Sequence, residues 1–218
     1  MSAVTIHLLR TSGRLEPFVP RISSIVTSTL ERVQAVLPIQ NVDIVLCDNP
    51  TWTIPESGFG GYTPEPHLVQ IWFDPTSAVF DTNLERELAP TLAHELHHAT
   101  RWRDPGYGRT LPEALVTEGL AQCLEVEFRN GETPFYAAPL EGDQMTQMLE
   151  RARLEFGQAG YNHNAWFFGD AGLSIPRWTG YKLGFQLVSD YLNRTQQTAA
   201  QARHVNAETV LNTLEVHT

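Results

Sequence analysis

The sequence lacks several features that would assign it to whole classes of protein. It has only 2 cysteines among 218 residues, Cys47 and Cys123, too few for a disulfide framework in a chain of this length. We therefore expect two buried free thiols. No stretch approaches the roughly 18 apolar residues of a membrane-spanning helix. The N-terminal residues also lack the basic segment and apolar run of a secretion signal. These absences predict a cytoplasmic protein with no membrane partner.

Positive charge is also scarce. Lys and Arg number 15 against 25 Asp and Glu, which gives a formal net charge of −10, and no basic cluster stands out. Such a chain is a poor partner for nucleic acid or an anionic membrane. Hydrophobic residues make up 42% and charged residues 18%, a composition typical of an ordered globular protein. The length favours one domain over residues 1–218 with a sizeable core.

The most informative stretch is residues 91–101, TLAHELHHATR, which contains a match to H-E-x-x-H at 94–98. On an α-helix, positions i and i+4 lie one turn apart and about 40° apart around the axis, so His94 and His98 can turn their rings toward one point. Two histidines are two of the three protein ligands of a catalytic zinc, and Glu95 is placed to reach a water in the open position. We predict that His94 and His98 bind zinc and that Glu95 is the general base.

The surroundings of the motif predict a helix with a buried stripe, formed at helical spacing by Leu84, Leu88, Leu92, Leu96 and Ala99. Residues 82–85, TNLE, read as a capping box that begins this helix, and Asp104-Pro105-Gly106 ends it. Pro90 should bend it. Two alternatives stay open: the histidines are ordinary packed or surface residues, or His97 replaces His98 as a ligand. The i+4 spacing agrees better with Glu95 as the base, so His97 is predicted not to be a ligand.

Elsewhere the hydrophobic pattern predicts an α+β fold whose C-terminal half is mainly helical. The expected elements are a helix over 21–37, strands over 42–47 and 68–73, a loop over 48–66 with room for one short strand, a helix from a capping box at 110–113 to about 129, a helix capped by Asp143, a structured loop over 157–176, a helix through 178–192 and a short terminal helix. Strand 68–73 is expected at a sheet edge to which an extended peptide can add. Gly60-Gly61 would allow that backbone a close approach, with an ordinary turn as the alternative.

A third ligand should come from a downstream carboxylate. The nearby candidates are Glu113, Glu118, Glu125 and Glu127. Glu113 belongs to the second capping box. Glu125 is expected at the surface, and the alternative is an acceptor that supports a ligand histidine. Glu118 lies in the middle of the helix, about twenty residues after His98, beside Gly119 and Ala121, where a second helix can approach closely. A buried carboxylate needs a partner, so Glu118 is the predicted ligand, with a solvated surface residue as the alternative.

Three segments together resemble a known group of enzymes: HELHH at 94–98, EGLA at 118–121 and WTGYKLG at 178–184. They resemble the gluzincin metallopeptidases, of which thermolysin is the familiar member. They resemble more closely an uncharacterised bacterial family of predicted Zn-dependent proteases, over most of residues 40–195. The resemblance implies a zincin-like fold, with a small mixed sheet packed on the HExxH helix, an upper α/β lobe of about 1–103, a lower helical lobe of about 104–218 and a cleft between them.

The resemblance also implies one zinc ion held by His94, His98 and Glu118, with Glu95 as the base. One position departs from the thermolysin pattern, in which an Asp four residues after the ligand Glu supports a histidine. Here that position is Gln122, which implies a different or weaker support. Tyr181 is the candidate donor to the developing oxyanion, because it lies in the matching segment and a phenol donates without carrying charge. His163 and Arg177 are alternatives, and Tyr181 equally fits the packed stripe of its own helix.

The resulting hypothesis is a zinc-dependent peptidase that hydrolyses peptide bonds through a metal-held water, with a peptide or protein as substrate. One alternative is an inactive zincin fold that binds zinc or a peptide. Another is a zinc hydrolase of non-peptide amides. Glu95 favours hydrolysis, because a scaffold has no need of a carboxylate there. The substrate, endo or exo action and the oligomeric state stay open.

Overall fold

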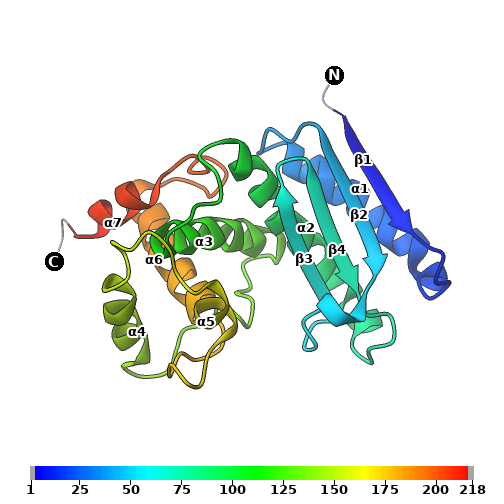
Figure 1. The fold of residues 1–218 in the computed structure, drawn as a ribbon. Coiled ribbons are helices and arrows are strands. Elements are labelled where there is room, and N and C mark those ends of the chain that lie inside the picture. The colour runs from blue at the N-terminus through cyan, green and yellow to red at the C-terminus, as the bar shows by residue number, and fades with distance from the viewer. Residues whose placement is uncertain (1–2, 216–218) are drawn as a thin grey trace. The chain divides into compact units, whose positions relative to one another are not determined.

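A computed structural model describes residues 3–215 (Figure 1). Strands and helices alternate in the first part of the chain and helices dominate the second, so the fold is mixed α+β. The elements are β1 (Val4–Leu9), α1 (Val19–Gln34), β2 (Val42–Asp48), β3 (Phe59–Glu65), β4 (Leu68–Phe73), α2 (Phe80–Arg103), α3 (Leu111–Phe128), α4 (Gln144–Arg153), α5 (His163–Phe168), α6 (Thr179–Thr195) and α7 (Ala207–Glu215), with 3-10 turns at Glu16–Phe18 and Pro50–Trp52. No helix among these residues is long and apolar enough to cross a membrane.

The chain divides into two compact units, described here one at a time. The first contains the residues up to Arg103 together with Glu127–Asn130. The second contains Asp104–Val126 and the residues from Gly131 onward. The four-stranded sheet belongs to the first unit, and α4 to α7 belong to the second.

The sheet has the strand order β1-β2-β4-β3. β1 and β4 pair with β2 in parallel, and β3 pairs with β4 antiparallel. The prediction that strand 68–73 lies at the edge is therefore wrong, since β4 is an inner strand and β3 forms the edge. The prediction failed because the glycines and prolines before β4 read as a loop, whereas residues 59–65 pair along β4 as a strand.

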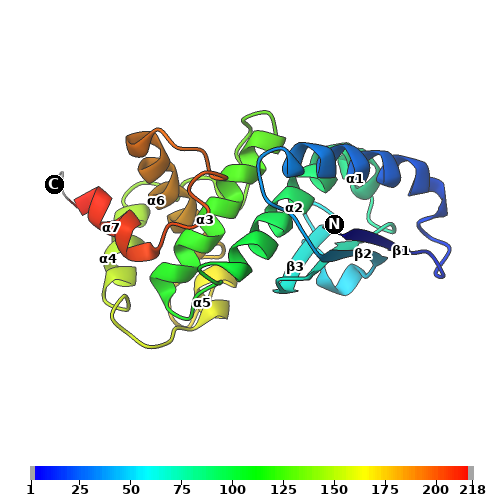
Figure 2. The same cartoon turned by 90° about the horizontal axis from the view of Figure 1, so that it is seen from above.

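The core of the first unit lies between the sheet and two helices. α1 and α2 cover the same face of the sheet in both views (Figures 1 and 2). Alternate residues of β2 and β4 point into this layer and are fully buried, namely Ile44, Leu46, Val69, Ile71 and Phe73. α1 buries the predicted stripe through Ile22, Val26, Leu30 and Val33. The two cysteines are free, as predicted, but each is only half-buried.

The two predicted capping boxes had different outcomes. In α2 the helix begins before Thr82, whose hydroxyl donates to the carbonyl of Val79, while the Glu85 carboxylate accepts from Arg21 of α1. The first predicted capping box is therefore wrong, because its glutamate, Glu85, binds Arg21 and not the backbone at Thr82. In α3 the second box is confirmed, since Glu113 accepts from the backbone N–H and the hydroxyl of Thr110 at 2.9 and 2.8 Å.

The second unit is built around a close helix contact that EGLA at 118–121 indicated. A Cβ at Gly119 of α3 would lie 2.2 Å from the carbonyl oxygen of Gly184 of α6, so only glycine fits there. A Cβ at Gly184 would lie 2.4 Å from the carbonyl oxygen of Leu115. The segments around 118–121 and 178–184 therefore meet in this unit. The predicted loop over 157–176 also contains the short helix α5, capped by the Asn162 side chain.

Candidate metal centre

The two motif histidines lie close together on α2. Their Nε2 atoms are 3.0 Å apart and their ring centroids 4.7 Å apart. His94 and His98 are 8% and 5% exposed, so the interpretation as surface histidines is wrong. Two bonds of about 2.1 Å at a tetrahedral angle would place two nitrogen ligands about 3.4 Å apart, close to the observed spacing. The pair therefore has the separation of two ligands to one small cation.

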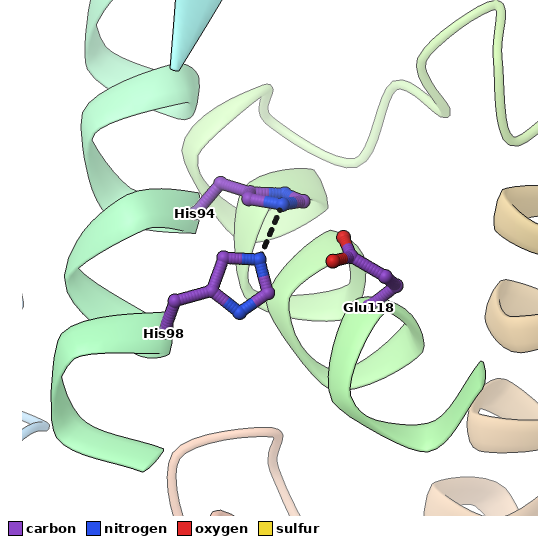
Figure 3. Close-up of side chains that lie close together, drawn as sticks. All are labelled: His94, His98 and Glu118. Carbon is purple, nitrogen blue, oxygen red and sulfur yellow. Dashed lines mark hydrogen bonds between the residues drawn. The ribbon is translucent and has the colours of Figure 1, made fainter. Parts of the chain in front are cut away.

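A carboxylate completes this group. His94, His98 and Glu118 are all buried, and each offers a ligand atom within 4.8 Å of the others. Figure 3 shows the two rings and the Glu118 carboxylate turned toward one another. His97 is fully buried but is not part of the group. Imidazole nitrogen and carboxylate oxygen are donors that zinc accepts in catalytic sites, so the residues fit that metal.

Glu118 also has a partner within its own unit, which the sequence did not reveal. The hydroxyl of Tyr107, in the link before α3, donates to Glu118 Oε1. The Tyr107 backbone is itself held, because its carbonyl accepts from the hydroxyl of Thr117 at 2.8 Å. Burial, followed by the charge of Glu118, raises the pKa of Tyr107 well above its usual value. Tyr107 is thus a neutral donor at ordinary pH.

Glu95 is held by the edge strand of the sheet. The Thr63 hydroxyl lies 2.7 Å from Glu95 Oε2 and 3.0 Å from the Glu95 carbonyl oxygen, and can donate to either. Gly61, two residues earlier on β3, lies so close that a Cβ there would be 2.4 Å from Glu95 Oε1. Gly60-Gly61 were predicted to permit a close approach. For Gly61 the group that approaches is Glu95.

Tyr181, the predicted oxyanion donor, lies in an aromatic cluster. Its ring centroid is 4.9 Å from that of Phe167 and 5.5 Å from that of Tyr136. His163 and Arg177 were the alternatives to Tyr181 as the oxyanion donor. His163 stacks on Phe167, and burial lowers its pKa. The Arg177 guanidinium lies 4.1 Å from the centroid of the Trp178 ring. The catalytic role of Tyr181 stays a prediction.

Two further side chains of α3 differ from expectation or add to it. Glu125 is fully buried and accepts from the Tyr136 hydroxyl at 2.5 Å, so its predicted surface position is wrong. Gln122 is also fully buried, and its amide atoms have no hydrogen-bond partner among the described residues. Thr63 and Tyr107 were missed altogether. Thr63 follows Gly61 by two residues and so shares its face of β3, which is a signal that could have indicated Thr63. No comparable signal in the sequence indicated Tyr107.

A buried set of two histidines and a glutamate is a combination of donors that catalytic zinc sites use. Residues 22–212 match the family described as "Predicted Zn-dependent protease (DUF2268)", and the chain belongs to this family. It is also similar to "Uncharacterized protein YjfC" of Bacillus subtilis (strain 168), with 28% identity over 174 residues. That match covers 72% of this chain and 55% of the relative, so the chain spans about half the length of the curated relative. No solved structure matches it.

Proposed function

We propose that this protein is a zinc peptidase of the gluzincin type with a zincin-like fold. His94, His98 and Glu118 would hold one zinc ion, and Glu95 would be the general base. The observation that carries this proposal is the 3.0 Å separation of the two histidine Nε2 atoms within a buried group that includes Glu118. Membership in a family of predicted Zn-dependent proteases supports it.

The reaction would be hydrolysis of a peptide bond. Zinc, when bound, supplies a Lewis acid that polarises a carbonyl and makes a water more acidic. Glu95 takes a proton from the attacking water as the water oxygen bonds to the carbonyl carbon. The carbon–nitrogen bond then breaks, and Glu95 returns the proton to the leaving amine. One carboxylate therefore accepts the proton of the water and returns it to the leaving amine.

The developing oxyanion needs a donor that is present before the reaction. Tyr181 is proposed for this role, since its phenol is neutral and lies in the segment that matches the resemblance. A single donor of this kind is worth roughly 3 kcal/mol in other hydrolases. Tyr181→Phe removes the hydroxyl and keeps the ring that packs against Phe167. It should lower kcat by about 100-fold, with little change in KM.

The test measures zinc content and cleavage of an unfolded protein substrate by the wild type and by Glu95→Gln. Both should bind one zinc per chain, and the variant should lose cleavage by about 1,000-fold or more. Glu85→Gln is the matched control, because Glu85 is an exposed carboxylate on the same helix. Equal cleavage by Glu95→Gln and the wild type would show that the proposed base is wrong. Zinc binding without cleavage of any peptide would favour a non-catalytic protein or a hydrolase of other amides.

A further inference from the structure

We infer that the edge strand β3 positions the general base, through contacts of Gly61 and Thr63 with Glu95. This inference rests on the role proposed above for Glu95. Neither residue belongs to the H-E-x-x-H motif, and they act on the reaction only through Glu95. They are therefore positioning residues. Gly61, Thr63 and Glu95 all lie in the first compact unit.

The Gly61 contact is a matter of space. A Cβ at this position would lie 2.4 Å from Glu95 Oε1, 2.7 Å from Cγ and 2.8 Å from Cδ. Real Cβ atoms do not approach other heavy atoms this closely. The Glu95 side chain therefore lies against β3 at Gly61, in space that the Cβ of any other residue would fill.

The Thr63 contact is a matter of direction. Residues 61 and 63 point to the same face of a strand, while Tyr62 between them is 54% exposed. Thr63 is 5% exposed, and its hydroxyl lies within hydrogen-bond distance of two oxygens of Glu95. Its backbone carbonyl accepts from Trp102 Nε1 of α2 at 2.8 Å, which ties this part of β3 to the same helix.

Together the two contacts limit a side chain that is otherwise flexible. A glutamate has three rotatable side-chain bonds, so its carboxylate can occupy many positions around a helix. β3 occupies part of that space and offers a hydroxyl to Oε2, which selects one position. A misplacement of about 1 Å at a reacting group can cost about 100-fold in rate, so the position held by β3 should appear in kcat.

The activity test compares matched pairs of variants at both positions. Gly61→Ala should lower kcat by about 100-fold while KM and zinc content stay the same. Gly60→Ala is its control, because that Cβ would clash with the Trp52 carbonyl oxygen at 2.2 Å and not with Glu95. Thr63→Val should lower kcat by about tenfold, and Thr63→Ser, which keeps the hydroxyl, should recover most of that loss. An unchanged kcat in Gly61→Ala, or equal kcat losses in the valine and serine variants, would overturn the inference.

A stability test does not depend on activity. If the added methyl group meets the Glu95 side chain, Gly61→Ala should lower the melting temperature in the wild type and much less in a Glu95→Ala background. Gly60→Ala should cost the same in both backgrounds. Equal losses from Gly61→Ala in both backgrounds would overturn the positioning role alone. Wild-type protein that cleaves no peptide would instead overturn the proposed function, so the two failures are distinguishable.

Discussion

Glu95 and Glu118 are two buried carboxylates on different helices, and their surroundings differ in ways that suit the two roles proposed for them. They are 6% and 4% exposed. Each carboxylate accepts a hydrogen bond from a hydroxyl outside its own helix. The donor to Glu95 is Thr63, and the donor to Glu118 is Tyr107. A neutral hydroxyl directs a carboxylate without cancelling its charge. Both carboxylates are thus oriented by a neutral partner, which adds no charge of its own.

The two carboxylates differ in what holds them. Glu95 lies against a strand of the sheet, with a glycine beneath its carboxylate. Glu118 accepts a hydrogen bond from Tyr107, in the link before α3. The position of α3 is fixed by the close contact of Gly119 with Gly184 of α6. We therefore expect changes around Glu95 to affect the rate, and changes around Glu118 to affect metal affinity. Three predictions test the two sides of this contrast, and a fourth extends the comparison to a surface carboxylate.

The largest difference in zinc affinity should come from replacing each carboxylate by the neutral amide of glutamine. Glu118→Gln should weaken zinc binding by more than about 100-fold, since even outer partners of a metal ligand are worth about 10- to 100-fold. Glu95→Gln should leave zinc affinity within about threefold, because Glu95 is proposed to act on water and not on the metal. Competition with a chromophoric chelator measures both. Glu127→Gln, an exposed carboxylate of α3, is the control. Equal zinc affinities in the two main variants would end the contrast.

The next effect concerns the backbone that carries Glu118. Gly119→Ala places a methyl group 2.2 Å from the Gly184 carbonyl oxygen, so α3 and α6 must move apart. Overpacking of this kind costs about 1–3 kcal/mol of unfolding free energy, which urea denaturation can measure. Gly160→Ala is the control, since its Cβ would meet nothing within 4 Å. Similar urea midpoints for the two variants would argue against a tight contact between these helices.

A smaller effect is expected from the hydroxyl that Glu118 accepts. Tyr107→Phe keeps the ring and the backbone bond with Thr117 but removes the donor, so zinc affinity should fall by about tenfold. Thr63→Val removes the corresponding donor from Glu95 and should leave zinc affinity unchanged. The same chelator competition compares them. If Thr63→Val weakened zinc binding as much as Tyr107→Phe does, the division of roles between the two hydroxyls would be wrong.

The parts of the site that follow from local periodicity could be predicted from the sequence. The approach of His94 to His98 is a consequence of the i+4 spacing, and the start of α3 follows from a capping box whose two members bond each other. The small residues after Glu118 likewise indicated a close helix contact, which Gly119 makes. In the first two cases the interacting residues lie within a few positions of each other in the sequence. In the third, the helix contact requires only that the residue be small.

The parts that depend on contacts distant in sequence could not be predicted. The first capping box failed because Arg21 of another helix takes Glu85. Residues 48–66 were predicted to be a loop with room for one short strand because of their prolines and glycines, and nothing there indicated that Gly61 accommodates a side chain 34 positions later. Nothing in the residues around Tyr107 pointed to Glu118. Side-chain partners of this kind become visible only when the fold brings them together.

The smallest effect extends the comparison to a carboxylate held at the surface. Glu85 of α2 accepts from Arg21, and these hydrogen bonds lower the pKa of Glu85 below its usual 4.5. A lowered pKa stabilises the folded state above the unfolded pKa, and this contribution is lost as the pH falls through the folded value. The deficit of Glu85→Gln in urea midpoint should therefore be small at pH 7 and shrink steadily below about pH 4.5. A deficit that is the same at pH 7 and at pH 3 would mean that Glu85 stabilises α2 by packing and not by charge.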